Sequence, residues 1–196
     1  MPNSMINIKK RTFAATSLLI GAIIICNVVL ILRNFKLRET LMQALRPKYL
    51  EVGTSVPAFH GDGIDGGELT LEYGIDPRKT ILLVFSPKCE WCSKNLPNWQ
   101  AIIGGVSPKL YRIIGISTSV VGLPEYIKDS VLNRISIIAR AQEQDIRAYR
   151  LNGTPLTIAI DNRGKVEKVW PGPFQNESLA DAEKYFSIRL PGLKIQ

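Results

Sequence analysis

The feature that most limits what this chain can fold into is an uncharged, apolar segment of 21 residues between Arg11 and Arg33. At about 1.5 Å of rise per residue, a helix of this length covers the ~30 Å hydrocarbon core of a membrane. A cleavable signal peptide is the alternative, but its apolar stretch spans only about 7 to 15 residues and ends at a small-x-small site, which does not follow Leu32. We therefore predict a tail over residues 1–11 and a single, uncleaved transmembrane helix over residues 12–32.

The distribution of charge bears on the partners of the chain. Lys and Arg total 25 and Asp and Glu total 17, but the excess flanks the apolar segment. Eight basic residues and one acid lie before residue 51, and the rest of the chain carries 17 basic and 16 acidic residues. A nucleic-acid-binding domain carries its excess of Lys and Arg on a folded surface. We therefore predict no nucleic-acid partner.

The same charges bear on the orientation of the membrane helix. Three basic residues and the amino terminus precede the helix and five basic residues follow it, which favours a cytoplasmic domain by the positive-inside tendency. Long domains, however, cross a membrane largely regardless of nearby charge, and a chain whose only span lies at its start usually exports the domain after that span. We therefore expect residues 33–196 outside the cytoplasm, with residues 33–50 as a helical juxtamembrane connector at the bilayer surface.

From residue 51 onward, short apolar runs alternate with stretches of helical period, and Pro, Gly and Asp separate them. The predicted strands lie at 80–85, 110–116, 156–160 and 165–170. The predicted helices lie at 93–103, 125–133, 141–151 and 176–188. This alternation is typical of an α/β domain, which we place over residues 51–196.

Two features invite a metal-binding interpretation, and neither carries the ligands. The stretch GDGIDGG at 61–67 resembles a calcium loop, but its third and fifth positions are Ile64 and Gly66, which offer no side-chain oxygen. We interpret it as a glycine-rich turn before a strand at Leu69. His60, the only histidine of the chain, has no cysteine near it in sequence and is expected in a loop. No metal site is predicted.

The motif Cys-Glu-Trp-Cys at 89–92 lies where a predicted strand passes into a predicted helix. Two cysteines three residues apart in the first turn of a helix share a face, with Cα atoms about 5 to 6 Å apart, which suits a disulfide. The unpaired N–H groups and the dipole at the helix start favour a thiolate at Cys89, while Lys88 adds to this effect and Glu90 opposes it. We expect Cys89 to be the nucleophile and the more shielded Cys92 to resolve the mixed disulfide.

Cysteines at this spacing also serve other purposes. A zinc site needs four ligands, and with Cys26 in the membrane helix only His60 remains to complete one. Haem attachment requires a histidine after the second cysteine, where this chain has Ser93. An inert structural disulfide is the alternative that stays open beside a redox-active pair.

Three stretches of the chain are similar to one known family. The run FSPKCEWCSKNLPNW at 85–99, with Pro97 five residues after the second cysteine, resembles an active-site strand followed by a kinked helix. The other matching residues are Gly53, Val56, Pro57 and Phe59, and Gly153-Thr154-Pro155 followed by LTIAI and DNRGK. The chain thereby resembles the thioredoxin superfamily over about residues 50–175, most closely its membrane-anchored TlpA-like and ResA-like branch. The resemblance implies a thioredoxin-like fold, an α/β domain with a central mixed sheet flanked by helices.

This resemblance also implies how a substrate is held. The peptide bond between Thr154 and Pro155 is expected to be cis, in a loop that faces the two cysteines. The backbone at Thr154 would pair with an extended substrate segment, and Trp91 would lie exposed beside that groove. The 63-residue separation of Pro155 from Cys92 implies an inserted strand-helix unit, as in TlpA-like and peroxiredoxin-like proteins.

The sequence departs from the family at two positions that concern proton transfer. Plain thioredoxins bury an acid six positions before the first cysteine, where this chain has Leu83. ResA-like proteins tend to place Glu three positions after the second cysteine, where this chain has Asn95. We therefore expect the Cys92 thiol to lack a nearby base, so that its pKa stays at or above the free value of ~8.5.

The function that the resemblance implies is a membrane-tethered thiol-disulfide oxidoreductase. Its Cys89–Cys92 pair would exchange a dithiol for a disulfide with protein thiols or disulfides, and no metal or organic cofactor is expected because the dithiol carries the electrons. The redox domain would face the periplasmic side of a bacterial cell membrane, with an upstream membrane electron donor or acceptor. By analogy with ResA-like proteins, the expected substrates are apocytochrome thiols. This would place the protein in cytochrome c biogenesis.

Two other functions stay open. Ser86-Pro87-Lys88-Cys89 faintly resembles the Thr-x-x-Cys motif of peroxiredoxins, which would make the chain a thiol peroxidase, although Leu82 stands where that pattern has Pro. A redox-inactive module that binds a partner through the face of Trp91 and Pro155 is the other alternative. Peroxide turnover would identify the first of these functions, and the absence of any mixed disulfide would favour the second.

Overall fold

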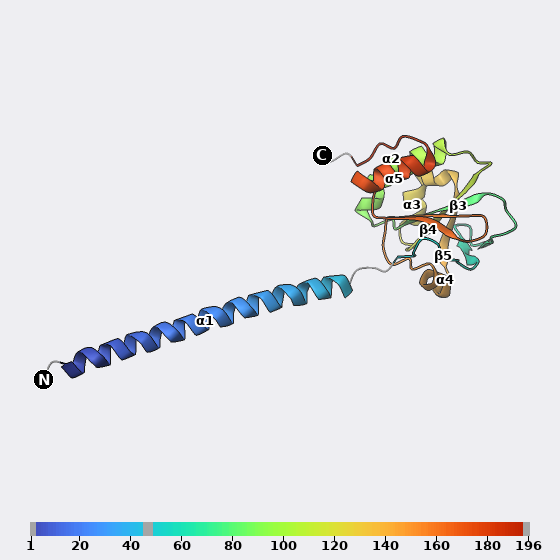
Figure 1. Ribbon diagram of the computed structural model, residues 1–196. Helices are drawn as coiled ribbons and strands as arrows, with labels where there is room; N and C mark the ends of the chain where they lie inside the picture. The colour runs from blue at the N-terminus through green and yellow to red at the C-terminus, as the bar shows by residue number, and fades with distance from the viewer. Residues whose placement is uncertain (1–2, 45–48, 194–196) are drawn as a thin grey trace. The chain divides into compact units, whose positions relative to one another are not determined.

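A computed structural model describes residues 3–44 and 49–193, and their side chains from residue 20 to 41 and from 49 onward. The chain divides into two compact units, Met1–Arg46 and Pro47–Gln196, which are described separately (Figure 1). The division falls within the predicted connector. The predicted boundaries at residues 11, 32 and 50 stay predictions.

The first unit is dominated by one helix, α1, which runs from Asn3 to Ala44 without a break. Within it, Ile20–Leu41 has a mean hydropathy of 1.9 and none of its side chains is buried inside the structure. By length and composition this helix can cross a membrane. The expected helical character of the connector is confirmed as far as Ala44, and residues 45–48 of the connector lie outside the described residues.

The second unit is built on a mixed sheet. Its strands are β1 (Phe59–Gly63), β2 (Glu68–Leu71), β3 (Lys79–Phe85), β4 (Tyr111–Ser117), β5 (Ser136–Ala141), β6 (Leu156–Ile160) and β7 (Val166–Pro171). They lie in the order β2-β1-β5-β4-β3-β6-β7. The pairs β3–β4 and β4–β5 are parallel, and the remaining pairs are antiparallel. The predicted central mixed sheet is confirmed.

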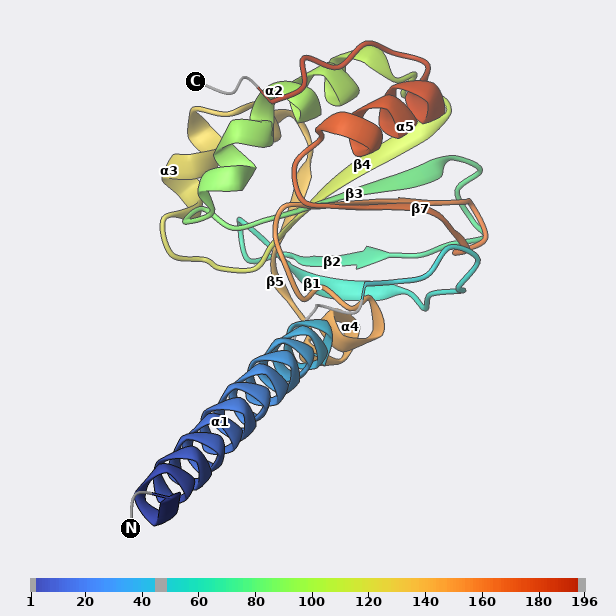
Figure 2. The ribbon, with the colours of Figure 1, turned by 60° about the vertical axis from the view of Figure 1, so that its left-hand side comes forward.

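Helices cover both faces of this sheet. They are α2 (Glu90–Gly105), α3 (Leu123–Lys128), α4 (Glu143–Ala148), α5 (Asn176–Phe186) and a 3-10 helix, η1 (Val131–Arg134). Figure 2 shows α2 and α5 together on one side of β3 and β7, and α4 on the other side. The sheet is therefore a middle layer, and the strand that leads into the cysteine motif, β3, lies in its interior between β4 and β6.

The interior position of strand β3 follows from its composition. Its alternate residues Ile81, Leu83 and Phe85 are fully buried in the core beneath α2 and α5. Leu82 and Val84 are fully buried in a second core on the opposite face. Burying each of these side chains contributes about 1.5 to 3 kcal/mol, so an apolar run with no polar alternation is stable only where both faces are covered.

The four predicted strands are confirmed within one or two residues, but β1 and β5 were not predicted. The glycines explain why β1 escapes prediction. A side chain at Gly61 would place its Cβ 2.4 Å from the carbonyl oxygen of Arg140 on β5, so the close approach of the two strands requires glycine. Gly61 and Gly63 therefore belong to β1, and the predicted glycine-rich turn is confined to the residues between β1 and β2.

Two predicted helices are wrong in extent. The helix predicted at 125–133 is divided in two, because the Ser130 hydroxyl accepts a hydrogen bond from the Leu132 N–H and starts the separate turn of η1. The helix predicted at 141–151 covers only Glu143–Ala148, since Ala141 belongs to β5. The segment from η1 through α4 inserts β5 next to β4, which confirms the expected inserted strand-helix unit.

Candidate functional site

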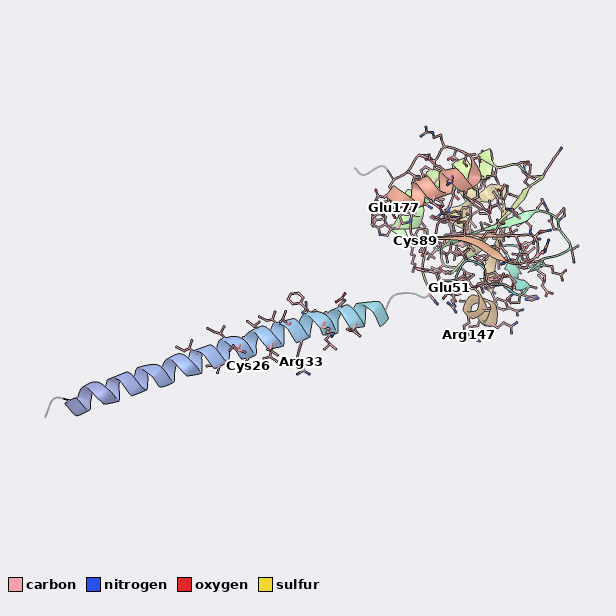
Figure 3. All side chains as sticks on the ribbon, viewed as in Figure 1. Cys26, Arg33, Glu51, Cys89, Arg147 and Glu177 are labelled. Atoms are coloured by element: carbon pink, nitrogen blue, oxygen red, sulfur yellow. A yellow bond between two sulfur atoms is a disulfide. The ribbon has the colours of Figure 1, made fainter. Side chains whose placement is uncertain are left out.

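The cysteine pair lies at the carboxyl end of β3, where the chain turns into α2. Cys89 is the N-cap of α2, with φ −88° and ψ 106°, and its sulfur accepts a hydrogen bond from the Cys92 N–H at 3.1 Å. The two residues form a disulfide with their Cα atoms 5.2 Å apart. Cys92 is fully buried and Cys89, labelled in Figure 3, is partly exposed. One sulfur is thus open to a partner and the other is enclosed, as the sequence predicts.

The charged neighbours of the pair point to solvent. Lys88 is exposed, and Glu90 pairs with Lys94 one turn along the helix at 2.7 Å. Hydrogen bonding to Lys94 lowers the pKa of Glu90. The Glu90 carboxylate is thus engaged by Lys94. The predicted effects of Lys88 and Glu90 on the thiols stay predictions.

Trp91 lies between the two cysteines in sequence and is 51% exposed. The Lys94 ammonium lies 4.8 Å from the centre of its ring, a cation-π contact that holds the indole against the surface of α2. An aromatic ring in this position offers an apolar contact to a segment that approaches Cys89. Its role in binding substrate stays a prediction.

The loop before β6 reaches the same end of the sheet. The Thr154–Pro155 peptide bond is cis, which confirms the prediction. Leu156 pairs with Val84, so Pro155 and Thr154, which precede Leu156, lie beside the end of β3 that leads to Cys89. Pro155 is buried and its carbonyl oxygen accepts a hydrogen bond from Gly172 N–H, while Thr154 is half-buried. The strand register therefore places the proline loop and the two cysteines at the same end of the sheet.

The two positions at which the family resemblance would place an acid are neutral and buried here. Leu83 lies in the core beneath α2, opposite Thr157 of β6. The Thr157 hydroxyl accepts a hydrogen bond from the Trp99 indole at 3.0 Å. Asn95 is also fully buried, one turn after Cys92. The only buried carboxylate among the described residues is Asp145, which lies on α4.

A polar pair on the inner face of α2 was not fully predicted. Asn98 and Asn95 are both buried, and the Asn98 amide donates to Asn95 Oδ1 at 2.9 Å. Two backbone groups donate to the pair as well: Phe174 N–H to Asn95 Oδ1 and Gly192 N–H to Asn98 Oδ1. The spacing of three residues from Cys92 to Asn95 and again to Asn98 is the sequence signal that places these side chains on one helix face.

His60 does not contribute to this site, and its predicted loop position is wrong. It lies in β1, where both its backbone N–H and its Nδ1 contact Asp145 Oδ2, at 2.7 and 3.0 Å. This pair ties β1 to α4, which packs on the sheet face opposite α2. Within residues 20–41 and 49–193, no group of three or more His, Cys, Asp or Glu side chains is placed to hold a metal ion.

No protein-family model matches the chain, and no curated protein sequence matches it. Solved structures do. A protein named as the thiol:disulfide interchange protein DsbE from Chlorobium tepidum superposes with a TM-score of 0.60 at 17% identity, over 70% of this chain and 97% of that one. The thioredoxin domain of a thiol-disulfide oxidoreductase from Bacteroides vulgatus gives 0.56 at 20% identity, over 70% and 99%. StoA from Bacillus subtilis gives 0.52 at 20% identity, over 68% and 99%. The second unit of this chain therefore has the thioredoxin fold.

Proposed function

We propose that this protein is a membrane-tethered thiol-disulfide oxidoreductase. The observation that carries the proposal is the asymmetry of the disulfide, in which Cys89 caps α2 and is partly exposed while Cys92 is fully buried. A structural disulfide needs no such difference between its sulfurs, whereas an exchange reaction needs one sulfur to be attacked and the other to leave. The names of the similar structures support the same activity.

The chemistry runs through a mixed disulfide. In the direction that oxidises a partner, a partner thiolate attacks the Cys89 sulfur, the Cys89–Cys92 bond breaks, and its electron pair leaves on Cys92 as a thiolate. A second partner thiolate then attacks the partner sulfur that is bound to Cys89, which forms the partner disulfide and releases Cys89 as a thiolate. The reverse sequence reduces a partner disulfide. The electrons pass between sulfur atoms only, so the two cysteines need no further cofactor.

A protein segment fits this site better than a small thiol alone. Thr154 precedes β6, where its backbone would pair with an extended chain, and the exposed indole of Trp91 lies in the turn that carries the disulfide. Backbone pairing tolerates many side chains. The substrates we propose are therefore protein thiols or disulfides, apocytochrome thiols among them. An electron donor or acceptor in the membrane would restore the cysteine pair to its starting redox state.

The apolar helix α1 supports a location at the bacterial cell membrane, and we propose that the redox domain faces the periplasmic side. Protease added to spheroplasts without detergent should then digest the domain. Protection of the domain until detergent dissolves the membrane would reverse this orientation. A cytoplasmic protein digested only after lysis serves as the control for intact membranes.

The activity is tested by trapping partners on the full chain. Cys92→Ala should accumulate mixed disulfides on non-reducing gels, because Cys89 still attacks and no second thiol resolves the product. Cys89→Ala should trap none, since Cys92 is fully buried. Equal trapping by the two variants would contradict the assigned roles, and trapping by neither would contradict the activity.

A further inference from the structure

The inner face of α2 carries a directed chain of hydrogen bonds that ends near the disulfide. Gly192 N–H donates to Asn98 Oδ1 at 2.8 Å, and the Asn98 amide donates to Asn95 Oδ1 at 2.9 Å. Phe174 N–H also donates to Asn95 Oδ1, at 3.0 Å. Because a backbone N–H can only donate, these contacts fix which atom of each side-chain amide is oxygen and which is nitrogen.

This arrangement leaves one donor of the two buried side-chain amides without an acceptor. Asn95 Nδ2 has no hydrogen-bond partner within the described part of the chain, although Asn95 is fully buried. An unsatisfied buried polar group costs about 1 to 3 kcal/mol. We therefore ask which acceptor would satisfy Asn95 Nδ2 in another redox state of the protein.

The direction of the chain identifies that partner. Side chains on a helix lean toward its N-terminus, over the residue three or four positions earlier. Asn98 shows this geometry, since it reaches back to Asn95. Asn95 Oδ1 is engaged with Asn98 and Phe174, so its Nδ2 is the one donor of the pair that is left for another acceptor. The residue three positions earlier is Cys92, which is buried on the same face of α2.

We propose that Asn95 is a catalytic residue, whose Nδ2–H donates a hydrogen bond to the Cys92 sulfur when the disulfide opens. The proposal rests on the proposed function, in which Cys92 leaves as a thiolate. A sulfur in a disulfide is a weak acceptor, whereas a thiolate carries a full charge and accepts strongly. The bond between Cys89 and Cys92 breaks, the electron pair goes to Cys92, and the Asn95 amide stabilises the new charge without giving up a proton.

Among the described side chains no Lys, Arg or His is buried, so no enclosed cation does the same for Cys92. Asp145, the one buried carboxylate of the described residues, contacts His60 on the far face of the sheet. Tyr126 of α3 packs against Phe85 in the same core, and burial raises the pKa of Tyr126, which keeps its phenol neutral. On α2 itself, Glu90 is exposed and pairs with Lys94. A neutral amide thus stands where the chemistry needs charge stabilisation.

The test is the ionisation of Cys92 in the full chain in detergent. In a Cys26→Ala, Cys89→Ser background, Cys92 is the only thiol, and its thiolate absorbance can be followed against pH. Adding Asn95→Ala should raise the pKa of Cys92 by about one unit, a tenfold loss of thiolate at a given pH below the pKa. An unchanged or lowered pKa would overturn the proposal.

Two further variants separate hydrogen bonding from packing. Asn98→Ala breaks the same polar chain one step earlier but keeps the Asn95 donor, so it should shift the Cys92 pKa by less than a third as much as Asn95→Ala. Asn95→Leu keeps a side chain of similar volume and removes the donor without adding a charge, so it should raise the Cys92 pKa about as much as Asn95→Ala does. Equal shifts for Asn95→Ala and Asn98→Ala, or no shift for Asn95→Leu, would show that Asn95 acts only through packing.

These measurements need no partner protein. A failure to trap mixed disulfides would contradict the proposed function and leave the titration result standing. A Cys92 pKa that does not respond to Asn95 would contradict only the role of Asn95. If Asn95→Ala does not fold, Asn95→Leu, which removes the donor without adding a charge, carries the test.

Discussion

Leu83 lies directly opposite Thr157 where β3 pairs with β6, and the Thr157 hydroxyl accepts a hydrogen bond from Trp99 Nε1. The three side chains are fully buried beneath α2. A position where plain thioredoxins carry an acid is thus apolar here, and the polar group next to it joins the helix to the sheet. This contact therefore fastens the middle of α2 to strand β6.

We predict that Thr157→Val destabilises the protein, because it leaves the Trp99 indole N–H buried without an acceptor. The free energy of unfolding should fall by about 1 to 3 kcal/mol. Urea unfolding of the full chain in detergent, followed by near-ultraviolet circular dichroism, measures the loss. In the presence of Trp99→Phe, Thr157→Val should cost at least about 1 kcal/mol less, since no indole remains to be satisfied. Strict additivity of the two changes would show that the hydrogen bond contributes nothing.

Resolution of the mixed disulfide should accelerate as pH rises, and Glu90 should take no part in this dependence. Hydrogen bonding to Lys94 lowers the pKa of Glu90, so its exposed carboxylate is ionised throughout the range from pH 6 to 8 and exchanges no proton there. Below the pKa of Cys92, the thiolate fraction and hence the rate rise about tenfold per pH unit. Stopped-flow release of a coloured thiol from a preformed Cys89 mixed disulfide gives the profile. We expect the same profile in Glu90→Gln, and a rate that is flat over this range in the parent protein would reveal another base.

Trp91→Ala should slow exchange with peptides and leave exchange with glutathione unchanged. The indole is 51% exposed and offers an apolar contact to a chain that approaches Cys89, whereas glutathione is too small to need that contact. Loss of a central aromatic contact of about 1.4 kcal/mol corresponds to a tenfold lower second-order rate. Leu110→Ala is the matched control, because Leu110 is 63% exposed and lies just before β4, at the opposite end of the parallel strands. Equal slowing with both reactants would place the effect on Cys89 itself.

Asp181 should stabilise the protein above about pH 4 and lose this effect in acid. Its pKa is lowered chiefly by Lys168 at 2.6 Å and further by the Trp170 indole, against an opposing effect of burial. A carboxyl whose pKa is lower in the folded than in the unfolded state contributes stability above its unfolded pKa and loses it as pH falls through the folded value.

Asp181→Asn should therefore lower the free energy of unfolding at pH 7 by about 1 kcal/mol, a modest value because both partners are partly exposed. The difference from the parent protein should shrink as the pH approaches 3. Urea unfolding at a series of pH values measures it. Glu72→Gln, at an exposed position, serves as the control for the loss of one surface charge. A difference that stays constant with pH would contradict the assignment.

The sequence predicts the parts of this fold that depend on local pattern. The run at β3 has no polar residue after Thr80, which marks a strand buried on both faces, and the turn at 161–164 marks the hairpin between β6 and β7. The cysteine motif between a strand and a helix gives the geometry of the site. These signals lie within a few residues of one another, so they can be read without knowing the tertiary structure.

The features that escaped prediction depend on contacts far apart in the chain. A strand with two glycines, β1, exists because β2 and β5 pair with it on either side. From the sequence alone, Asn98 would be placed on the surface of a helix. In the structure it is buried, and its Oδ1 accepts a hydrogen bond from Gly192, 94 residues later. Proximity along the sequence showed that Asn95 is unusual, but its orientation follows only from Phe174 and Asn98.

The two outer strands of the sheet give neighbouring copies little to pair with. β2 has only four residues, and β7 ends at Pro171, which has no N–H to offer. The charged side chains of β7 are occupied as well, since Glu167 contacts Lys79 and Lys168 contacts Asp181. Copies anchored in one membrane by α1 would meet far more often than copies diffusing in solution. Short, interrupted sheet edges keep such encounters from growing into intermolecular sheets, so the domain tolerates crowding on a surface.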